Sequence, residues 1–575
     1  MNASHPFLVV IREAGFGRSS FLMTLMLVAL SLMAVRAFFL QVVDAPFLRH
    51  EARRQQIETI QEEGHRGMIL DRHGRPLAIS TPVDSLWANP RVLIKEPLQW
   101  PRLARAIGWS TIRFTHRLLV QRHEQFMYLR REVDPRFAQR VLDLRIPGVA
   151  SQREYRRYYP TGAVSATLIG FTNISDQGQD GIELAYNAIL SPHRGRAVMI
   201  RDGRGQPIAL RKGHHPPLPG QNLTLSIDQR LQYLAYRQLL KAVRYHDASS
   251  GSAIILNPRT GEVLALANVP SFNPNTRSDL NSRYYRDRAV TDVIEPGSSL
   301  KPFTIALALQ SGRIVPHTLV STTPGDYWVG PNKISDVGNF GLIDVSHVIA
   351  ESSNVGASKI ALTTLTKEAM YRNFVNLGLT HFTHAGLPGE SSGFLAPPNT
   401  WAPIQKATLS FGYGISITPL QLARAYTVFS NGGVLEPISV LKTTAPPQGR
   451  RIFSHKVVRE MRHMLELAAS PMGTGETADI VNYRIAGKTG TAHIADLKGY
   501  HRHRYVASFA GFAPASDPRL AMVVVIRDPQ KHGYYGAQCA APVFRKVMTG
   551  ALRILNIPPD DPVTTLARVK TGYRP

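Results

Sequence analysis

The sequence predicts an α+β protein in which one antiparallel sheet is covered by helices, behind a single N-terminal membrane helix. Three observations support this fold class. Residues 19–43 form one long apolar stretch. Two hairpin patterns, over 252–267 and 506–526, lie at opposite ends of a region that begins near Asn222. The chain between them has mostly helical patterns, so we expect the strands from both ends to meet in one sheet.

The composition narrows the class of protein. The chain has 575 residues, enough for two to four folded units with ample cores. Its single cysteine, Cys539, excludes intramolecular disulfides and metal sites built on cysteines, and we expect it to be a small buried residue. The net charge is +26, but the basic residues are scattered and no zinc-finger or RNA-recognition signature is present. No nucleic-acid partner is expected, whereas an anionic membrane or cell-wall polymer suits the charge.

The apolar stretch near the N-terminus predicts a membrane anchor. From Ser19 to Val35 the chain has 17 uncharged residues, or about 25 up to Val43 if Arg36 is allowed. About 20 residues are needed to cross the hydrocarbon core of a membrane. The stretch is too long for a cleaved signal peptide and lacks a small-residue cleavage site, so we expect an uncleaved span. Arginines on both sides leave its orientation open.

The rest of the chain divides by composition. A polar, partly helical stalk is expected over 44–65, and an arginine-rich region without long hydrophobic periodicity follows over 66–220. Beyond it the composition becomes that of a compact globular core. The predicted parts are an N-terminal segment 1–18, a membrane helix 19–43, a stalk and second domain 44–220, a main domain 221–557 and a disordered polar tail 558–575.

Local patterns define the two ends of the main domain. LTLSID predicts a short strand and a helix cap at Asp228. Apolar residues then recur at helical spacing: Leu231, Leu234, Ala235, Leu239, Ala242 and Val243. SAIIL and EVLALA flank NPRTG, which predicts a hairpin with Gly261 at the turn. VASFAGFAP and LAMVVVI flank ASDPR and predict a second hairpin.

Three short motifs in the main domain carry the candidate chemistry. They occur in the order Ser298-Ser299-Leu300-Lys301, Ser352-Ser353-Asn354 and Lys488-Thr489-Gly490-Thr491-Ala492. Each alone is a weak pattern, because such residues are also helix caps, turn formers or solvated side chains. The ordered combination of S-x-x-K, S-x-N and K-T-G-T is far more specific and favours a catalytic interpretation.

The residue types are chemically coherent. A serine hydroxyl is a poor nucleophile near neutral pH and needs an adjacent base. Positions i and i+3 share a helix face, so Lys301 is expected beside Ser298. A lysine acts as a base only when burial or a nearby positive charge lowers its pKa, and Lys488 is the candidate for that charge. Pro296-Gly297 predicts a helix start that would give Ser298 free backbone N–H groups for an oxyanion.

With these motifs, the chain resembles the penicillin-binding proteins and serine β-lactamases. It is most similar to the class B penicillin-binding proteins, and within them to the division-specific peptidoglycan D,D-transpeptidases of Gram-negative bacteria. The resemblance extends over nearly the whole chain, through blocks at 66–74, 153–162 and 181–183 and through LSIDQRLQYLA, TGEVLALANVPSFNPN, ESSNVGASKIA, SFGYGISITPLQLARAY and GYYGAQCAAPVF. It implies a penicillin-binding, serine β-lactamase-like transpeptidase domain after an elongated α/β pedestal over 66–220 that carries no chemistry.

The resemblance also implies roles for the motif residues. Ser298 would be acylated by the penultimate D-Ala of a stem peptide or by a β-lactam, and Lys301 would be its base. Ser352 would pass a proton to the leaving amine, and Asn354 would bind the substrate backbone. The carboxylate site would be Lys488 and Thr489 in the KTG motif with Gly490, and the backbone N–H groups of Ser298 and Thr491 would form the oxyanion hole. No cofactor or metal is implied, and His501 and His503 on a polar loop are expected to be solvated.

The family further implies location and partners. The N-terminus would be cytoplasmic, the anchor would cross the inner membrane once, and the catalytic domain would act in the periplasm at the division septum. By analogy the pedestal would contact a polytopic peptidoglycan glycosyltransferase and other division proteins. The alternatives are an elongation-specific or specialised class B transpeptidase, a D,D-carboxypeptidase and a non-catalytic division scaffold.

Overall fold

The computed structural model describes residues 13–48, 57–62, 64–201, 207–210, 215–276, 281–444, 448–496 and 499–561. The chain forms two compact units. One contains residues 1–64 and 192–219, and the other contains residues 65–191 and 220–575.

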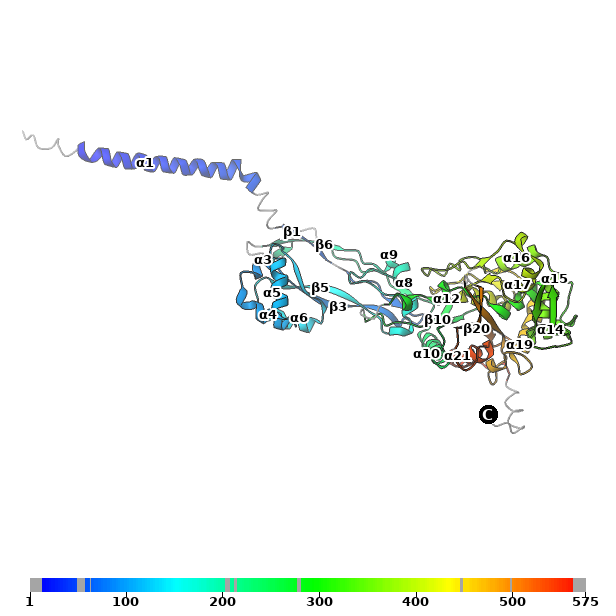
Figure 1. Ribbon diagram of the computed structural model, residues 1–575. Helices are drawn as coiled ribbons and strands as arrows, with labels where there is room; N and C mark the ends of the chain where they lie inside the picture. Colours follow the sequence, from blue (N-terminus) through cyan, green and yellow to red (C-terminus); the bar gives the residue numbers. More distant parts are fainter. Residues whose placement is uncertain are drawn as a thin grey trace, which may run out of the picture. The chain divides into compact units, whose positions relative to one another are not determined.

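The first unit contains the expected membrane helix. Helix α1 spans Glu13–Phe38 and continues into a short π-helix, Phe39–Val43 (Figure 1). The stretch Ser19–Val43 is long and apolar enough to cross a membrane, and none of it is buried against the protein. The hydrophobic side chains along it, such as Phe21 and Met33, are therefore available to lipid. The first twelve residues of the predicted segment 1–18 lie outside the described residues.

A small antiparallel sheet completes the first unit. Its strands are β1 (Ile57–Glu62), β6 (Gly195–Arg201) and β7 (Pro207–Leu210), in the order β1-β6-β7. Residues 45–48 of the stalk are helical as expected, but Ile57–Glu62 is a strand. Three β-branched residues, Ile57, Thr59 and Ile60, favour a strand here. Its partner strand β6 lies more than 130 positions later, which the local pattern could not indicate.

The second unit begins with an α/β region formed by residues 65–191. Long strand β3 (Pro76–Ala88) pairs with β4 (Met127–Val133), β5 (Val149–Tyr158) and short β2 (Ile69–Leu70). Strand β2 also pairs in parallel with β8 (Leu223–Thr224). The helices of this region are α3 (Pro90–Leu93), α4 (Trp100–Ala106), α5 (Thr111–Val120), α6 (Pro135–Leu142), α7 (Ala166–Ile169), α8 (Gly181–Ala185) and α9 (Asn187–Leu190). Apolar residues of α4, α5 and α6 pack against β3 and β4 and form one hydrophobic core.

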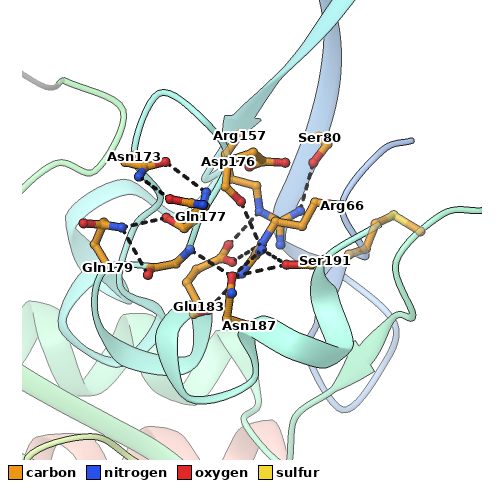
Figure 2. Close-up of polar contacts among 12 residues, drawn as sticks. Arg66, Ser80, Arg157, Asn173, Asp176, Gln177, Gln179, Glu183, Asn187 and Ser191 are labelled. Atoms are coloured by element: carbon orange, nitrogen blue, oxygen red, sulfur yellow. Dashed lines mark hydrogen bonds and ion pairs between the residues drawn. The ribbon is translucent and has the colours of Figure 1, made fainter. Parts of the chain in front are cut away.

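A buried ionic network ties the segments of this region together. The Glu183 carboxylate accepts hydrogen bonds from Arg66 Nε at 2.7 Å and Arg157 Nε at 2.6 Å, and all three side chains are almost fully buried. Arg66 also donates to the side chains of Asn187 and Ser191 (Figure 2). Three chain segments that are distant in sequence therefore meet at one carboxylate.

The main domain is built on a five-stranded antiparallel sheet, as predicted. The strand order is β10-β9-β21-β20-β19. The strands are β9 (Ser250–Leu256), β10 (Val263–Val269), β19 (Ala486–Asp496), β20 (Gly499–Ala513) and β21 (Leu520–Arg527). Both predicted hairpins are confirmed as the β9–β10 and β20–β21 pairs, and Gly261 has the positive φ of +71° that favours glycine at the turn.

Helices cover both faces of this sheet (Figure 1). Along β21, Met522 and Val524 pack with α10 (Gln229–Tyr245) and α21 (Ala541–Ile554), whereas Val523 and Val525 join the core on the other face. The core of that other face contains apolar side chains of α13 (Lys301–Gln310), α14 (Val345–Ala350), α15 (Asn354–Thr364), α16 (Lys367–Asn376), α18 (Pro419–Ser430) and α19 (His455–Ala469). The uninterrupted apolar sequence of β21 follows from burial on both faces.

Shorter elements surround this core. The helices are α11 (Ser282–Tyr285), α12 (Arg288–Thr291), α17 (Pro403–Leu409) and α20 (Gly536–Cys539). The strands form four pairs: β11 (Leu319–Ser321) with β14 (Leu342–Asp344), β12 (Asp326–Val329) with β13 (Asn332–Ser335), β15 (Phe394–Leu395) with β16 (Ile415–Ser416), and β17 (Val434–Leu435) with β18 (Arg450–Arg451).

Three further expectations can be compared with the structure. Asp228 is the N-cap of α10 and accepts a hydrogen bond from Arg230 N, as predicted. Cys539 is buried, and burial raises the pKa of its thiol to about 12. The predicted tail is fixed at its start, because Asp560 accepts hydrogen bonds from Arg484 N and Ser516 N. Residues 562–575 of the tail lie outside the described residues.

Candidate active site

Ser298 lies on a tight turn before a helix. A 3-10 turn spans Gly297–Leu300, and α13 begins only at Lys301, with Pro302 in its first turn. The α-helix therefore starts later than Pro296-Gly297 suggested, because the residues after Gly297 first form the tighter 3-10 turn. Gly297 itself has a positive φ of +55°, a conformation that favours glycine. Lys301 Nζ nevertheless lies 3.0 Å from Ser298 Oγ, as the three-residue spacing predicted.

Lys301 is the central group of the site. Its Nζ donates to Asn354 Oδ1 at 2.8 Å, to Ser352 Oγ at 3.1 Å and to the Ser352 carbonyl. The side chain is completely buried. The structure therefore joins the first two predicted motifs through one nitrogen atom, which contacts the Ser298 hydroxyl at the same time.

The second motif is held by a residue that the sequence analysis missed. Asp336 follows β13 and accepts hydrogen bonds from Ser353 Oγ at 2.6 Å and from the backbone N–H of Asn354 and Val355. These are the N-terminal N–H groups of α15, so the carboxylate caps this helix. Ser352 has a φ of +62°, an uncommon backbone conformation for a serine, and the capped loop maintains it.

The third motif lies on strand β19. Lys488 is fully buried, and its Nζ donates to Thr474 Oγ1 at 2.9 Å and to Thr489 Oγ1 at 3.3 Å. The Thr474 and Thr489 hydroxyls are themselves 2.9 Å apart. Thr474 lies in the loop after α19 and was not identified from sequence, because no short motif surrounds it.

Gly490 explains how this strand approaches the Ser298 turn so closely. A Cβ atom at position 490 would lie 2.3 Å from Ser299 Oγ, 2.3 Å from Ser508 Oγ and 2.8 Å from Pro296 O. Any other residue would therefore push β19 away from the turn. On the next residue, Thr491 Oγ1 accepts a hydrogen bond from Gly536 N at 3.0 Å.

Both buried lysines have lowered pKa values. Burial lowers the pKa of Lys301 well below its ordinary value, and the positive charge of Lys488 lowers it further, whereas Asp336 acts in the opposite direction. Burial lowers the pKa of Lys488 to about 7, against a smaller opposing effect of Glu351. A neutral amine is thus available at Lys301 at pH values where an exposed lysine is charged.

A cavity of about 590 Å³ opens onto these groups. Its lining includes five predicted site residues and the adjacent Ala492; the five are Ser298, Ser352, Asn354, Thr489 and Thr491. Tyr505 and Tyr534 stack with their rings 4.1 Å apart and form part of its wall. The structure therefore brings all three sequence motifs to one cavity that can hold a peptide terminus.

His501 and His503 were expected to be solvated, and the structure has His501 partly buried and His503 exposed. Among the described residues, no group of three His, Cys, Asp or Glu side chains could hold a metal ion. His501 instead uses its backbone carbonyl to contact His493 Nδ1 at 3.0 Å.

Comparison with known proteins gives the family. The penicillin-binding protein transpeptidase domain matches residues 251–549, and the penicillin-binding protein dimerisation domain matches residues 61–225. The chain is 41% identical to peptidoglycan D,D-transpeptidase FtsI of Escherichia coli K12 over 93% of this chain and 91% of that protein. This chain belongs to the class B penicillin-binding proteins. It is also 39% identical to the probable peptidoglycan D,D-transpeptidase PenA of Neisseria gonorrhoeae, over 96% of this chain and 95% of that protein.

Solved structures agree with this assignment to the penicillin-binding proteins. The transpeptidase domain of Burkholderia pseudomallei penicillin-binding protein 3 is 41% identical, with a TM-score of 0.55, and covers 59% of this chain and 98% of that domain. A peptidoglycan synthetase from Bifidobacterium adolescentis covers 88% of this chain and 98% of that protein with a TM-score of 0.71. At 23% identity, the latter shows the fold alone.

The lowered pKa values of the two lysines predict the direction of the pH dependence of acylation in this penicillin-binding protein. Acylation by a penicillin with a free carboxylate is expected to follow a bell-shaped profile. The rising limb reports deprotonation of Lys301, well below the ordinary lysine pKa. The falling limb begins near pH 7, where Lys488 loses the charge that would attract the carboxylate, and decreases about tenfold per pH unit. Stopped-flow measurement of the second-order acylation rate at each pH provides the profile.

A penicillin methyl ester is the control for this profile. It lacks the carboxylate, so its acylation should keep the rising limb and lose the fall above pH 7. Equal falling limbs for the acid and the ester would contradict carboxylate binding by Lys488.

The capping role of Asp336 predicts a second effect. Asp336→Asn removes the negative charge that raises the pKa of Lys301, so the rising limb of the acylation profile should move to lower pH. Asp336→Ala also removes the cap of the Ser352–Asn354 loop and should slow acylation at least about tenfold. Asp326→Asn, in the same β12–β13 hairpin but contacting Ser335 and Lys333, is the matched control. If the rising limb of the acylation profile shifts by the same amount in Asp326→Asn and Asp336→Asn, the electrostatic explanation is refuted.

Proposed function

We propose that this chain is a peptidoglycan D,D-transpeptidase that crosslinks stem peptides during septal wall synthesis and is acylated by β-lactams. The observation that carries the proposal is the contact of the buried Lys301 amine with the Ser298, Ser352 and Asn354 side chains at once. A neutral amine there can take the Ser298 proton while Ser298 Oγ attacks a carbonyl. The named activity of the FtsI and PenA relatives agrees with this chemistry.

The reaction proceeds in two halves. In the first, Ser298 Oγ forms an ester with the penultimate D-Ala carbonyl, and the terminal D-Ala leaves with a proton that Ser352 delivers to its amine. Lys488 and Thr489 bind the terminal carboxylate, and Asn354 holds the donor backbone. The N–H groups of Ser298 and Thr491 stabilise the tetrahedral oxyanion. In the second half, an amine of a neighbouring stem peptide attacks the ester, forms the crosslink and returns the proton to Ser298.

The anchor supports a location for this reaction. The single apolar helix and the FtsI relatives support an inner-membrane protein with one span. We place residues 1–18 in the cytoplasm and the catalytic domain in the periplasm at the division septum, where the peptidoglycan substrate lies. The dimerisation-type region 44–220 is proposed to contact a polytopic peptidoglycan glycosyltransferase and other division proteins.

Crosslinking by the purified full-length protein tests this function. Incubated with donor peptides ending in D-Ala-D-Ala and with an amine acceptor, the protein should release one D-Ala per crosslinked dimer, as measured by mass spectrometry. Release of D-Ala without dimers would replace the proposal by a D,D-carboxypeptidase. A fluorescent fusion that follows the lateral wall without midcell enrichment would replace the septal role by an elongation role.

A further inference from the structure

A second cavity lies in the main domain, outside the catalytic one. It has a volume of about 350 Å³ and lies where the end of α16, the side of α18 and β18 meet. Its polar lining includes Asn376, His381, His384, Arg424 and Arg450, and it shares no residue with the catalytic cavity. We call it the arginine pocket.

Arg424 lies half-buried in this pocket. Its Nε donates to the Glu436 carbonyl at 3.0 Å. Among the described residues, neither of its two Nη groups has a hydrogen-bond partner. Burial lowers the pKa of Arg424, and the positive charge of Arg450 lowers it further. A guanidinium with unused donors thus lies close to a second positive charge, an arrangement that a bound anion would relieve.

The second guanidinium is held in place by the end of α16. Arg450 Nη1 donates to Asn376 Oδ1 at 3.2 Å, and Nη2 donates to the Asn376 carbonyl at 2.5 Å. The nearby Gly378 has a φ of +76°, and a Cβ there would lie 3.1 Å from Arg424 Nη1. A side chain at position 378 would therefore restrict the space around the free donors of Arg424.

The acidic groups nearby do not neutralise the pocket. In the part of the chain that the structure describes, neither arginine forms an ion pair with a carboxylate. The carboxylate of Glu390 raises the pKa of Arg424, but its Oε2 already accepts hydrogen bonds from Thr383 Oγ1 and His384 N. His381 and His384 add two further side chains that can donate hydrogen bonds.

We propose that the arginine pocket binds a phosphate group, as a phosphate monoester or a diphosphate. Two guanidiniums can neutralise the two negative charges of such a group, and each can bind a pair of its oxygen atoms. A single carboxylate would neutralise only one of the two guanidiniums. The cavity volume is in the range of small-ligand sites. The phosphate can belong to a soluble molecule or to a lipid headgroup, because the same donors recognise both.

Isothermal titration of the full-length protein in detergent tests the site. The probes are sodium diphosphate, dihexanoyl phosphatidic acid and disodium succinate, each at constant ionic strength. Saturable binding of either phosphate probe is expected, with Arg424→Gln and Arg450→Gln each weakening it at least tenfold. A tighter diphosphate would assign the site to soluble phosphates, and a tighter phosphatidic acid would assign it to a lipid headgroup.

A matched variant separates the pocket from general surface charge. Arg451→Gln changes the next residue on β18, whose guanidinium contacts the Gly432 carbonyl and does not line the pocket, so its binding should equal the wild type. Retained penicillin acylation shows that each variant is folded. The proposal is overturned if neither phosphate probe binds the wild type, if the Arg424 and Arg450 variants bind normally, or if succinate binds as tightly as diphosphate.

Discussion

Ser298→Ala is expected to abolish covalent penicillin binding and peptide crosslinking. No other hydroxyl of the turn Gly297–Leu300 takes its place beside Lys301, because the neighbouring Ser299 hydroxyl is buried and donates to Pro296 O at 2.7 Å. Without the proposed nucleophile no ester can form, so the acylation rate should fall by at least about four orders of magnitude. Intact-protein mass spectrometry after penicillin treatment should show the added mass of one drug molecule in the wild type and none in the variant.

The matched control for this experiment is Ser311→Ala. Ser311 caps the far end of α13, where its hydroxyl donates to the Ala308 carbonyl. The Ser311→Ala variant should therefore be acylated by penicillin at the wild-type rate. Mapping the modified peptide of the wild type to residues other than 298 would contradict the assigned nucleophile. Equal labelling of the Ser298→Ala variant would do so as well.

Glu183→Ala is expected to be the most destabilising single substitution outside the active site. The change leaves the guanidiniums of Arg66 and Arg157 buried without their shared carboxylate (Figure 2). Removing one partner of a buried ion pair costs about 3–5 kcal/mol, because the remaining charge is uncompensated. Denaturant unfolding followed by tryptophan fluorescence should show a corresponding loss in the free energy of unfolding.

An exposed ion pair is the control for this loss. Arg259 and Asp517 also form a salt bridge, but both side chains are about half exposed or more. Asp517→Ala should therefore cost less than about 1 kcal/mol. Similar losses for the Asp517 and Glu183 variants would contradict the importance of burial for the network.

Much of the main domain could be predicted from the sequence because its signals are local. The β9–β10 and β20–β21 hairpins each combine alternating or continuous apolar residues with a turn sequence, and the helix after Asp228 begins with its own cap. Likewise, the spacing of Ser298 and Lys301 lies within one turn. Such features depend on a few neighbouring residues, so the sequence alone contains them.

The features that were missed depend on contacts between distant segments. Asp336 and Thr474 reach the site from a hairpin and a loop without any motif of their own. The strand Ile57–Glu62 exists because β6 pairs with it, and its own polar residues indicated a helical stalk. In the same way, Arg66, Arg157 and Glu183 each belong to a recognisable block, but their meeting at one carboxylate is a property of the fold.

The parallel pairing of β2 with β8 has a consequence for synthesis of the chain. Met68 N donates to the Asn222 side chain, 154 positions later, and the two strands continue this pairing. At ribosomal speeds of about 5–20 residues per second, the nascent strand at Ile69 waits roughly 8–30 seconds for its partner. For most of that interval Glu183, the buried ion-pair partner of Arg66, has also not yet been synthesised. A chain interrupted before residue 223 would therefore present an open strand edge to proteases and chaperones.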